Sequence, residues 1–254
     1  MLPARLIGQI KPESWGGILD GTYAIILTLL TIELPVQILS ILDRLANSAQ
    51  YPALQQFMGI KVDIWFSFFN LMIGYFAVFI IIYDIWSYHR VIIGVDGRLH
   101  LRAILTSWTL FLGTLIPSLH YVVNTVRQKF VFAGAIESSP IALELHFARA
   151  LEYPVIAVTY FFLFLQAASD LAHISGDNTP NDEKDALRFV ARTTLTKSVL
   201  VIVAFLGFEY ISGHNPSWHL VWEAPGVLVI IAILTYANLD LFRFIPRRIL
   251  FRGR

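Results

Sequence analysis

Six long runs of apolar residues, separated by shorter polar stretches, dominate the pattern of the chain. They cover roughly 17–39, 60–86, 100–123, 147–172, 193–213 and 219–242. Each run is near or above the ~20 residues that cross the hydrocarbon core of a bilayer as a helix. Transmembrane β-strands are about half as long and alternate polar with apolar residues. The pattern therefore predicts an all-α membrane protein, with residues 1–254 forming one domain of six transmembrane helices.

The composition agrees with a lipid-facing surface. Hydrophobic residues make up 56% of the chain and charged residues only 15%, against about 25% charged in an average soluble domain. The absence of cysteine excludes disulfides, thiolate metal sites and a cysteine nucleophile. A net charge of +1 argues against a nucleic-acid partner. The hydrophobic composition instead indicates that membrane lipid surrounds the chain.

Positive charge predicts the orientation of the helices. With the N-terminus in the cytoplasm, 14 of the 19 Lys and Arg residues fall on the cytoplasmic side and 5 on the external side. Six helices then place both termini in the cytoplasm. On this assignment Arg188, Arg192 and Lys197 are cytoplasmic anchors at the start of the fifth run.

The first run, 17–39, has two chemically different faces. At about 100° per residue, one face collects a stripe of mostly bulky apolar side chains with Thr28 beside it. The stripe consists of Ile18, Thr22, Ile25, Leu29, Ile32 and Val36. Asp20 points almost the opposite way, toward the rest of the bundle, and Pro35 is expected at the helix end. Such a stripe packs against another helix or lines a pore, and periodicity alone favours packing.

Ionisable residues near the ends of the spans are the other candidates for chemistry, because charge inside a membrane is costly. Asp20 and His89 are both expected at cytoplasmic helix ends, so a carboxylate–imidazole contact is geometrically allowed. The remaining polar residues near span ends are expected to be mostly interfacial: Asp63, His120, Asp170, His173, Glu209, Glu223 and Asp240.

Sequence signatures of enzymes are missing. The chain has no His-Glu-x-x-His, no Gly-x-Ser-x-Gly and no phosphate-binding Gly-x-x-x-x-Gly-Lys motif. Asp170 with His173 is the nearest approach to a catalytic set. The acidic stretch 176–185 is expected to be a solvated loop, with cation binding as the less favoured alternative. We therefore predict no catalytic residue, no resident metal and no cofactor.

Residues 20–33 resemble the signature of the transmembrane protein 175 family, whose animal members are endolysosomal potassium channels. The signature Asp-Gly-Val-Phe-Ala-Ile-x-Ile-Thr-Leu-Leu-x-Leu-Glu is matched by Asp-Gly-Thr-Tyr-Ala-Ile-Ile-Leu-Thr-Leu-Leu-Thr-Ile-Glu. Trp86-x-x-His89 and Leu115-Ile116-Pro117 are weaker matches, and the resemblance covers about the first 125 residues. The Phe-Ser that precedes the family's aspartate is replaced by Ile18-Leu19, and its upstream arginine by Ser14.

The resemblance implies a prokaryotic plasma-membrane protein whose six-helix subunits form a homotetramer around the first helix. Ile25, Leu29 and Ile32 would then form a bulky apolar constriction, and Thr28 would contribute to cation selectivity. Asp20 and His89 would make a smaller polar contact than in the family, because the Phe-Ser pair and the arginine are missing.

The expected function is thus a potassium-preferring cation channel, with K⁺ as the permeating ion. The first helix would end at the external mouth, where its negative end and Glu33 favour cations. A secondary transporter and a non-conducting scaffold or regulatory subunit remain as alternatives.

The charge asymmetry yields a topology test. Tags at either terminus should be reached only from the cytoplasmic side, and so should a cysteine placed at Gly176. Labelling of that cysteine by a membrane-impermeant maleimide added to intact cells would contradict the orientation.

Overall fold

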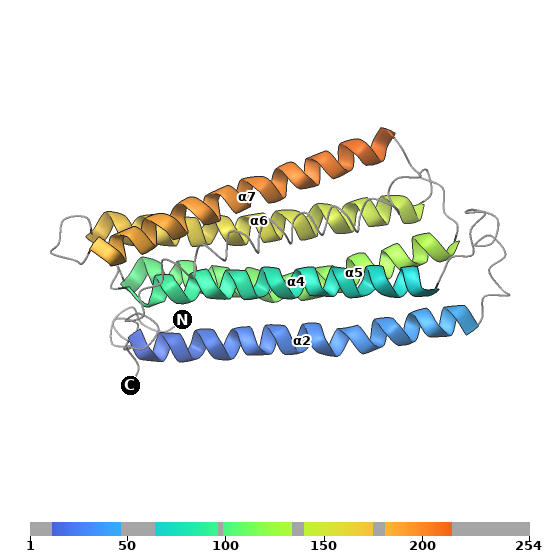
Figure 1. Cartoon of the computed structure of the whole chain (residues 1–254), viewed down its shortest axis with the longest axis horizontal. Coiled ribbons are helices and arrows are strands. Elements are labelled where there is room, and N and C mark those ends of the chain that lie inside the picture. Colours follow the sequence, from blue (N-terminus) through green and yellow to red (C-terminus); the bar gives the residue numbers. More distant parts are fainter. Residues whose placement is uncertain (1–11, 47–63, 96–98, 134–139, 175–180, 215–254) are drawn as a thin grey trace.

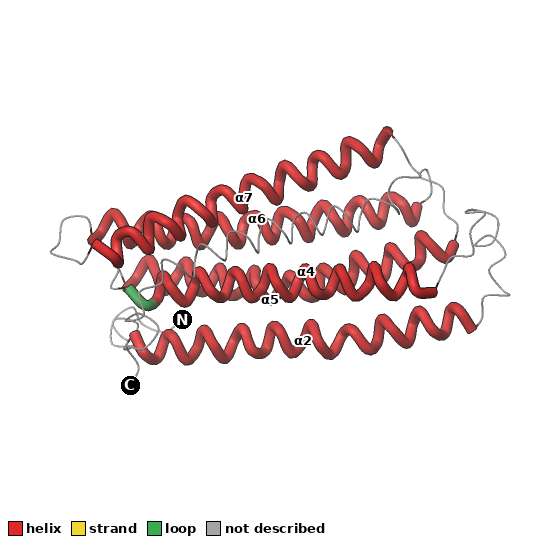
Figure 2. The backbone as a smooth tube through the Cα atoms, viewed as in Figure 1, coloured by secondary structure: helices red, strands yellow, loops and turns green. Residues whose placement is uncertain are grey.

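The computed structural model describes residues 12–46, 64–95, 99–133, 140–174 and 181–214, and these form five long helices. They are α2 (Pro12–Ala46), α4 (Ile64–Ile93), α5 (Leu99–Ala133), α6 (Pro140–Ile174) and α7 (Asn181–His214). Each helix runs antiparallel to the next along the chain (Figures 1 and 2). The described part of the chain is therefore all-helical, as the hydrophobic pattern predicts.

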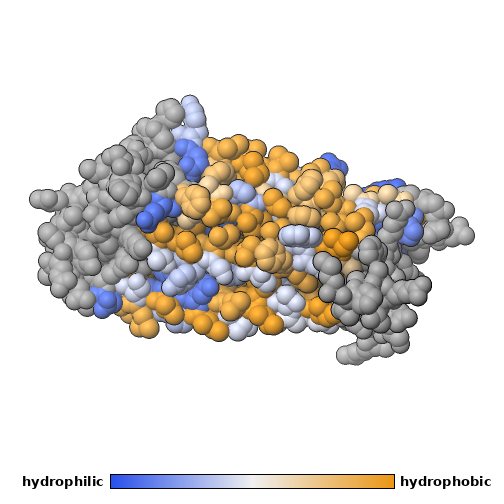
Figure 3. All heavy atoms as spheres, turned by 180° about the vertical axis from the view of Figure 1, so that it is seen from behind, coloured by the Kyte–Doolittle hydropathy of each residue, from blue (hydrophilic) through white to orange (hydrophobic). Residues whose placement is uncertain are grey.

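All five helices are long and apolar enough to cross a membrane. Their apolar stretches are Gly16–Asp43, Leu71–Ile93, Leu101–Val126, Phe147–Ile174 and Asn181–Gly207. These stretches have 23 to 28 residues, or about 35–42 Å at 1.5 Å per residue, which exceeds the ~30 Å hydrocarbon core. Apolar side chains cover the middle of the face shown in Figure 3. The sixth predicted span, 219–242, lies outside the described residues.

Several predicted boundaries are wrong. The helix α4 continues to Ile93 rather than ending at 86, so His89 lies within it. The helix α7 begins at Asn181, 12 residues before the predicted start at 193, because Asp182 and Glu183 in its first turn suit the positive end of the helix dipole. The predicted loop 124–146 is helical as far as Ala133 and again from Pro140.

Pro35, which was predicted at a helix end, lies inside a helix instead, and Pro117 is also within one. The helix α2 continues through Pro35 to Ala46, and α5 continues through Pro117 to Ala133. A proline removes one backbone hydrogen bond, whereas leaving the helix within a bilayer would expose several backbone groups to hydrocarbon. The continuous helix is therefore the less costly arrangement.

The packing places α4 at the centre of the described helices and α2 at one edge. The helix α4 contacts α2, α5, α6 and α7, while α2 packs against α4 and α5. In the most apolar stretch of α2 only 22% of residues are buried, against 50% in α4. Figure 1 shows α2 and α7 along opposite edges. Most of α2 therefore remains exposed in the single chain.

Trp108 lies at the surface of the described bundle. It is half-exposed and stacks on Phe162 of α6, with 6.4 Å between ring centroids. Phe111 meets it edge-on one turn along α5. The ring thus lies on the apolar outer surface of the bundle.

Candidate functional site

The helix α2 attaches to the bundle through one face. Buried side chains are spaced three, four or seven residues apart along this core face: Leu19, Tyr23, Ile26, Leu30, Gln37 and Ile41. The side-chain amide of Gln37 donates to Thr125 Oγ1 of α5 at 2.8 Å. Apolar packing and this polar contact fix the rotation of α2 about its own axis.

The bulky apolar stripe lies on a different face of the same helix and is exposed. Ile25 and Ile32 are 62% and 60% exposed, and Leu29 is 41% exposed, whereas the neighbouring Leu30 is only 3% exposed. Ile18 and Val36 extend the exposed stripe toward both ends. None of the described helices covers it, so packing within the described part of the chain does not account for the stripe.

Three threonines on α2 donate their hydroxyl protons back to the helix. Thr22, Thr28 and Thr31 bond to the carbonyl oxygens four residues earlier, at 2.9, 2.7 and 2.8 Å. A hydroxyl whose proton is used in this way still has lone pairs that accept from other groups. Thr28 is exposed, so its oxygen presents partial negative charge to whatever contacts that face.

The predicted contact between Asp20 and His89 is wrong. Asp20 accepts a hydrogen bond from Trp86 Nε1 at 3.0 Å and forms an ion pair with Arg90. His89 lies 3.3 Å from the Tyr23 hydroxyl and 3.3 Å from Thr106 Oγ1. Because α4 remains helical past residue 86, Trp86 and Arg90 lie one turn apart on the face that Asp20 reaches, while His89 faces the core.

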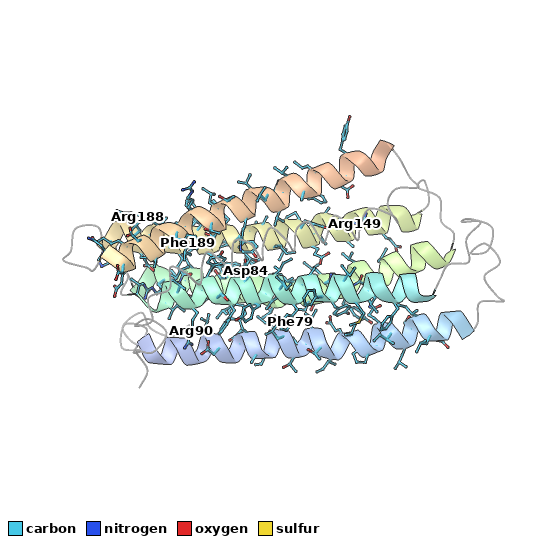
Figure 4. All side chains as sticks on the ribbon, viewed as in Figure 1. Phe79, Asp84, Arg90, Arg149, Arg188 and Phe189 are labelled. Atoms are coloured by element: carbon cyan, nitrogen blue, oxygen red, sulfur yellow. The ribbon has the colours of Figure 1, made fainter. Side chains whose placement is uncertain are left out.

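A buried ion pair between Asp84 and Lys197 lies in the interior of the bundle. Lys197 Nζ donates to Asp84 Oδ2 at 2.5 Å, and the Tyr160 hydroxyl donates to the same oxygen at 2.7 Å. The Lys197 ammonium also lies 4.6 Å from the centre of the Tyr88 ring. Figure 4 shows Asp84 between α4 and the α6–α7 pair. Lys197 is thus a core residue, and its prediction as a cytoplasmic anchor is wrong.

A second buried ion pair joins α5 to α6. Arg102 donates through Nε and Nη2 to Asp170 Oδ2, at 3.1 and 2.8 Å. Nearby, Gln166 Nε2 donates to Thr106 Oγ1 at 3.0 Å, which extends the polar contacts of His89 to α6. Asp170 was expected to be interfacial, but it is buried and paired with Arg102 across helices.

These contacts form a polar layer that links all five described helices. Removing a charge from water costs several kcal/mol per ion, which is offset only by close pairing. Each buried cation in the layer has a carboxylate partner, namely Lys197 with Asp84 and Arg102 with Asp170. The exposed pair of Arg90 with Asp20 adds little by itself, because water and salt screen it.

Asp84 was not among the residues predicted from the sequence. The signal was available, because a carboxylate inside an apolar run demands a partner. Its partner Lys197 lies 113 residues away on α7, and the pairing could not be read from local spacing.

A second polar cluster lies along α5 about four turns from Thr106. His120 Nδ1 contacts Glu152 Oε1 at 2.9 Å, and Asn124 Nδ2 contacts His120 Nε2 at 2.8 Å. Glu33 is half-buried on the side of α2 between Leu30 and Gln37, so its predicted role at an external mouth remains a proposal.

Comparison with protein-family models, with curated proteins and with solved structures gives no match to this chain.

The buried ion pair predicts non-additive losses of stability. Asp84→Asn leaves the Lys197 ammonium buried without its carboxylate partner, and Lys197→Met leaves the Asp84 carboxylate buried without its cation. Each change should lower the free energy of unfolding by about 3–5 kcal/mol. The double variant removes both charges and should be less destabilised than the sum of the single changes. Thermal unfolding of the purified protein in detergent measures this coupling. Additive losses would mean that the pair contributes nothing as a unit.

Proposed function

We propose that this chain is a subunit of a potassium-preferring cation channel, in which α2 of each subunit lines a central pore and the assembly is a homotetramer. The observation that carries the proposal is the two-faced character of α2. Its core face is packed against α4 and α5, and its stripe of Ile25, Leu29 and Ile32 is exposed within one chain. The same stripe occupies the constriction positions in the family that residues 20–33 resemble.

A constriction of this kind works by dewetting. An ion that passes rings of isoleucine and leucine loses water without gaining replacement ligands, so the constriction opposes conduction unless it is wide enough to hold water. In the tetramer, four Leu29 side chains would form one layer of the constriction. The exposed hydroxyl oxygen of Thr28, the preceding residue, would lie next to this layer. Selectivity from one hydroxyl layer should be modest compared with a cage of carbonyl oxygens.

The polar contacts of α2 would hold the pore helix in register. Asp20 is tied to Trp86 and Arg90, Tyr23 to His89, and Gln37 to Thr125. These contacts lie away from the exposed stripe and reach α4 or α5. Movement of α4 against α5 would therefore turn α2 and change the width of the constriction.

A secondary transporter is the second candidate, and the buried Asp84–Lys197 pair favours it. Ionisable pairs inside a bundle mark proton and ion pathways in many transporters. Flux measurements on purified protein in liposomes separate the candidates. A channel dissipates a K⁺ gradient passively, a transporter needs a coupled ion or substrate, and a non-conducting scaffold shows no flux.

Subunit assembly around α2 can be tested by cross-linking, because the chain contains no cysteine. Ile25→Cys in native membranes should give cross-linked dimers with a short bismaleimide, since the stripes of neighbouring subunits face one another. Leu30→Cys, on the buried core face, is the matched control and should stay monomeric. Equal cross-linking of the two variants would contradict assembly around this stripe.

A polar side chain within the stripe should ease conduction. Leu29→Ser lowers the dewetting barrier and should raise K⁺ flux several-fold while weakening discrimination between K⁺ and Na⁺. Leu30→Ser, one residue away but buried, should instead destabilise the bundle by about 2–5 kcal/mol, like other truncations of large core residues. Liposome flux and thermal unfolding measure the two effects. Equal flux changes at both positions would contradict the proposal that the stripe forms the constriction.

A further inference from the structure

After α2, the helix α7 is the least covered helix in the described part of the chain. Only 28% of its most apolar stretch is buried, against 44% to 50% in α4, α5 and α6. Leu187, Val190 and Val201 are buried on the face that packs against α6 and α4. The opposite face is exposed along its length, and we call it the α7 stripe: Arg192, Leu195, Val199, Val203, Leu206 and Tyr210.

The α7 stripe is apolar except for a cation near the start of the helix. Arg192 is exposed, and no carboxylate of the described residues pairs with it, whereas Arg188 pairs with Asp185 at 2.9 Å. Arg192 lies within the apolar stretch Asn181–Gly207, and a charge inside a membrane span favours a partner of opposite sign. The stripe therefore suits an apolar helix that carries a carboxylate at one end.

The chain itself contains such a segment. The predicted sixth span, 219–242, lies outside the described residues, and its sequence has an apolar stripe that ends in an aspartate. The members are spaced four, three, four, three and four residues apart: Trp222, Gly226, Val229, Ile233, Tyr236 and Asp240. This spacing puts all of them on one side of a helix. Gly226 would let a neighbouring helix approach closely.

The length of the connection limits where this segment can lie. The helix α7 ends at His214, and the predicted span begins at residue 219, so only four residues separate them. Connections of this length join antiparallel neighbours in helical bundles. Asn215-Pro216, in the middle of the connection, is a dipeptide that favours a turn.

The two stripes also agree in register. In an antiparallel pair whose turn is centred on Pro216, residues equally far from Pro216 lie at the same level. Arg192 and Asp240 are each 24 residues from Pro216, and Val203 and Val229 are each 13 residues from it. The unpaired cation of one stripe thus meets the carboxylate of the other at the level where the apolar positions also match.

We propose that residues 219–242 pack as an antiparallel helix on the α7 stripe, with Asp240 paired to Arg192. This interface lies within one subunit, on the edge of the bundle opposite α2 (Figure 1). It does not depend on the proposed channel function. It bears on that function, because a sixth helix on α7 leaves the stripe of α2 uncovered in the single chain.

Disulfide formation in native membranes tests the interface, because the chain contains no cysteine. Val203→Cys combined with Val229→Cys should form a disulfide within one chain on oxidation with copper phenanthroline. A protease site inserted after Pro216 reveals it, since the cleaved fragments stay joined until a reductant is added. Val201→Cys with Val229→Cys is the matched control and should give separate fragments, because Val201 is buried on the opposite face.

A charge exchange tests the polar end of the interface. Arg192→Asp should lower the Tm of the purified full chain by about 2–4 °C, since it places two carboxylates together. Adding Asp240→Arg should restore most of this loss. Arg188→Asp removes a cation that already pairs with Asp185, so Asp240→Arg should not restore its loss. Equal effects of Asp240→Arg on both variants would contradict the pairing with Arg192.

The cross-linking outcomes separate this proposal from the channel proposal. Separate fragments from Val203→Cys with Val229→Cys would overturn the interface and leave the α7 stripe to lipid. Disulfide-linked dimers of the uncleaved chain would assign the stripe to a second copy instead. A disulfide within one chain between Ile25→Cys and Val229→Cys would contradict both proposals, because the sixth span would then cover the stripe of α2.

Discussion

Neutralising charge without water is the constraint on which the rest of this bundle depends. Lys197 and Asp84 are buried where neither can be hydrated, so each is tolerated only because the other lies 2.5 Å away. Tyr160 donates to the same carboxylate, so the pair ties α7 and α6 to α4. This pairing makes α4 the central helix, and Arg102 with Asp170 joins α5 to α6 by the same principle.

The helix α2 is attached to this centre differently. Its contacts are a packed apolar face, an exposed ion pair between Asp20 and Arg90, and a few hydrogen bonds. These hydrogen bonds join Asp20 to Trp86, Tyr23 to His89, and Gln37 to Thr125 and the Tyr121 carbonyl. No buried cation–carboxylate pair joins it to the described helices. One face is therefore held in register while a wide opposite face remains available, and this asymmetry underlies the proposed role of α2 in a pore.

Consecutive residues of α2 lie in different surroundings. Ile32 and Glu33 are consecutive, so their side chains diverge by about 100°, and the first is 60% exposed while the second has a buried carboxylate oxygen. A cation moving along the stripe would contact the side of α2 on which Thr28 is exposed.

The sequence by itself determined the helical class, the approximate place of five spans and the two faces of α2, because hydrophobic periodicity is a local property. It misplaced the helix end at Pro35, since a bilayer makes an interrupted hydrogen bond less costly than exposed backbone. The sequence also predicted a contact between Asp20 and His89, which is wrong, and it did not point to Asp84. Only the tertiary structure decided these partners, because pairing across 66 to 113 residues depends on how helices rotate and pack against one another.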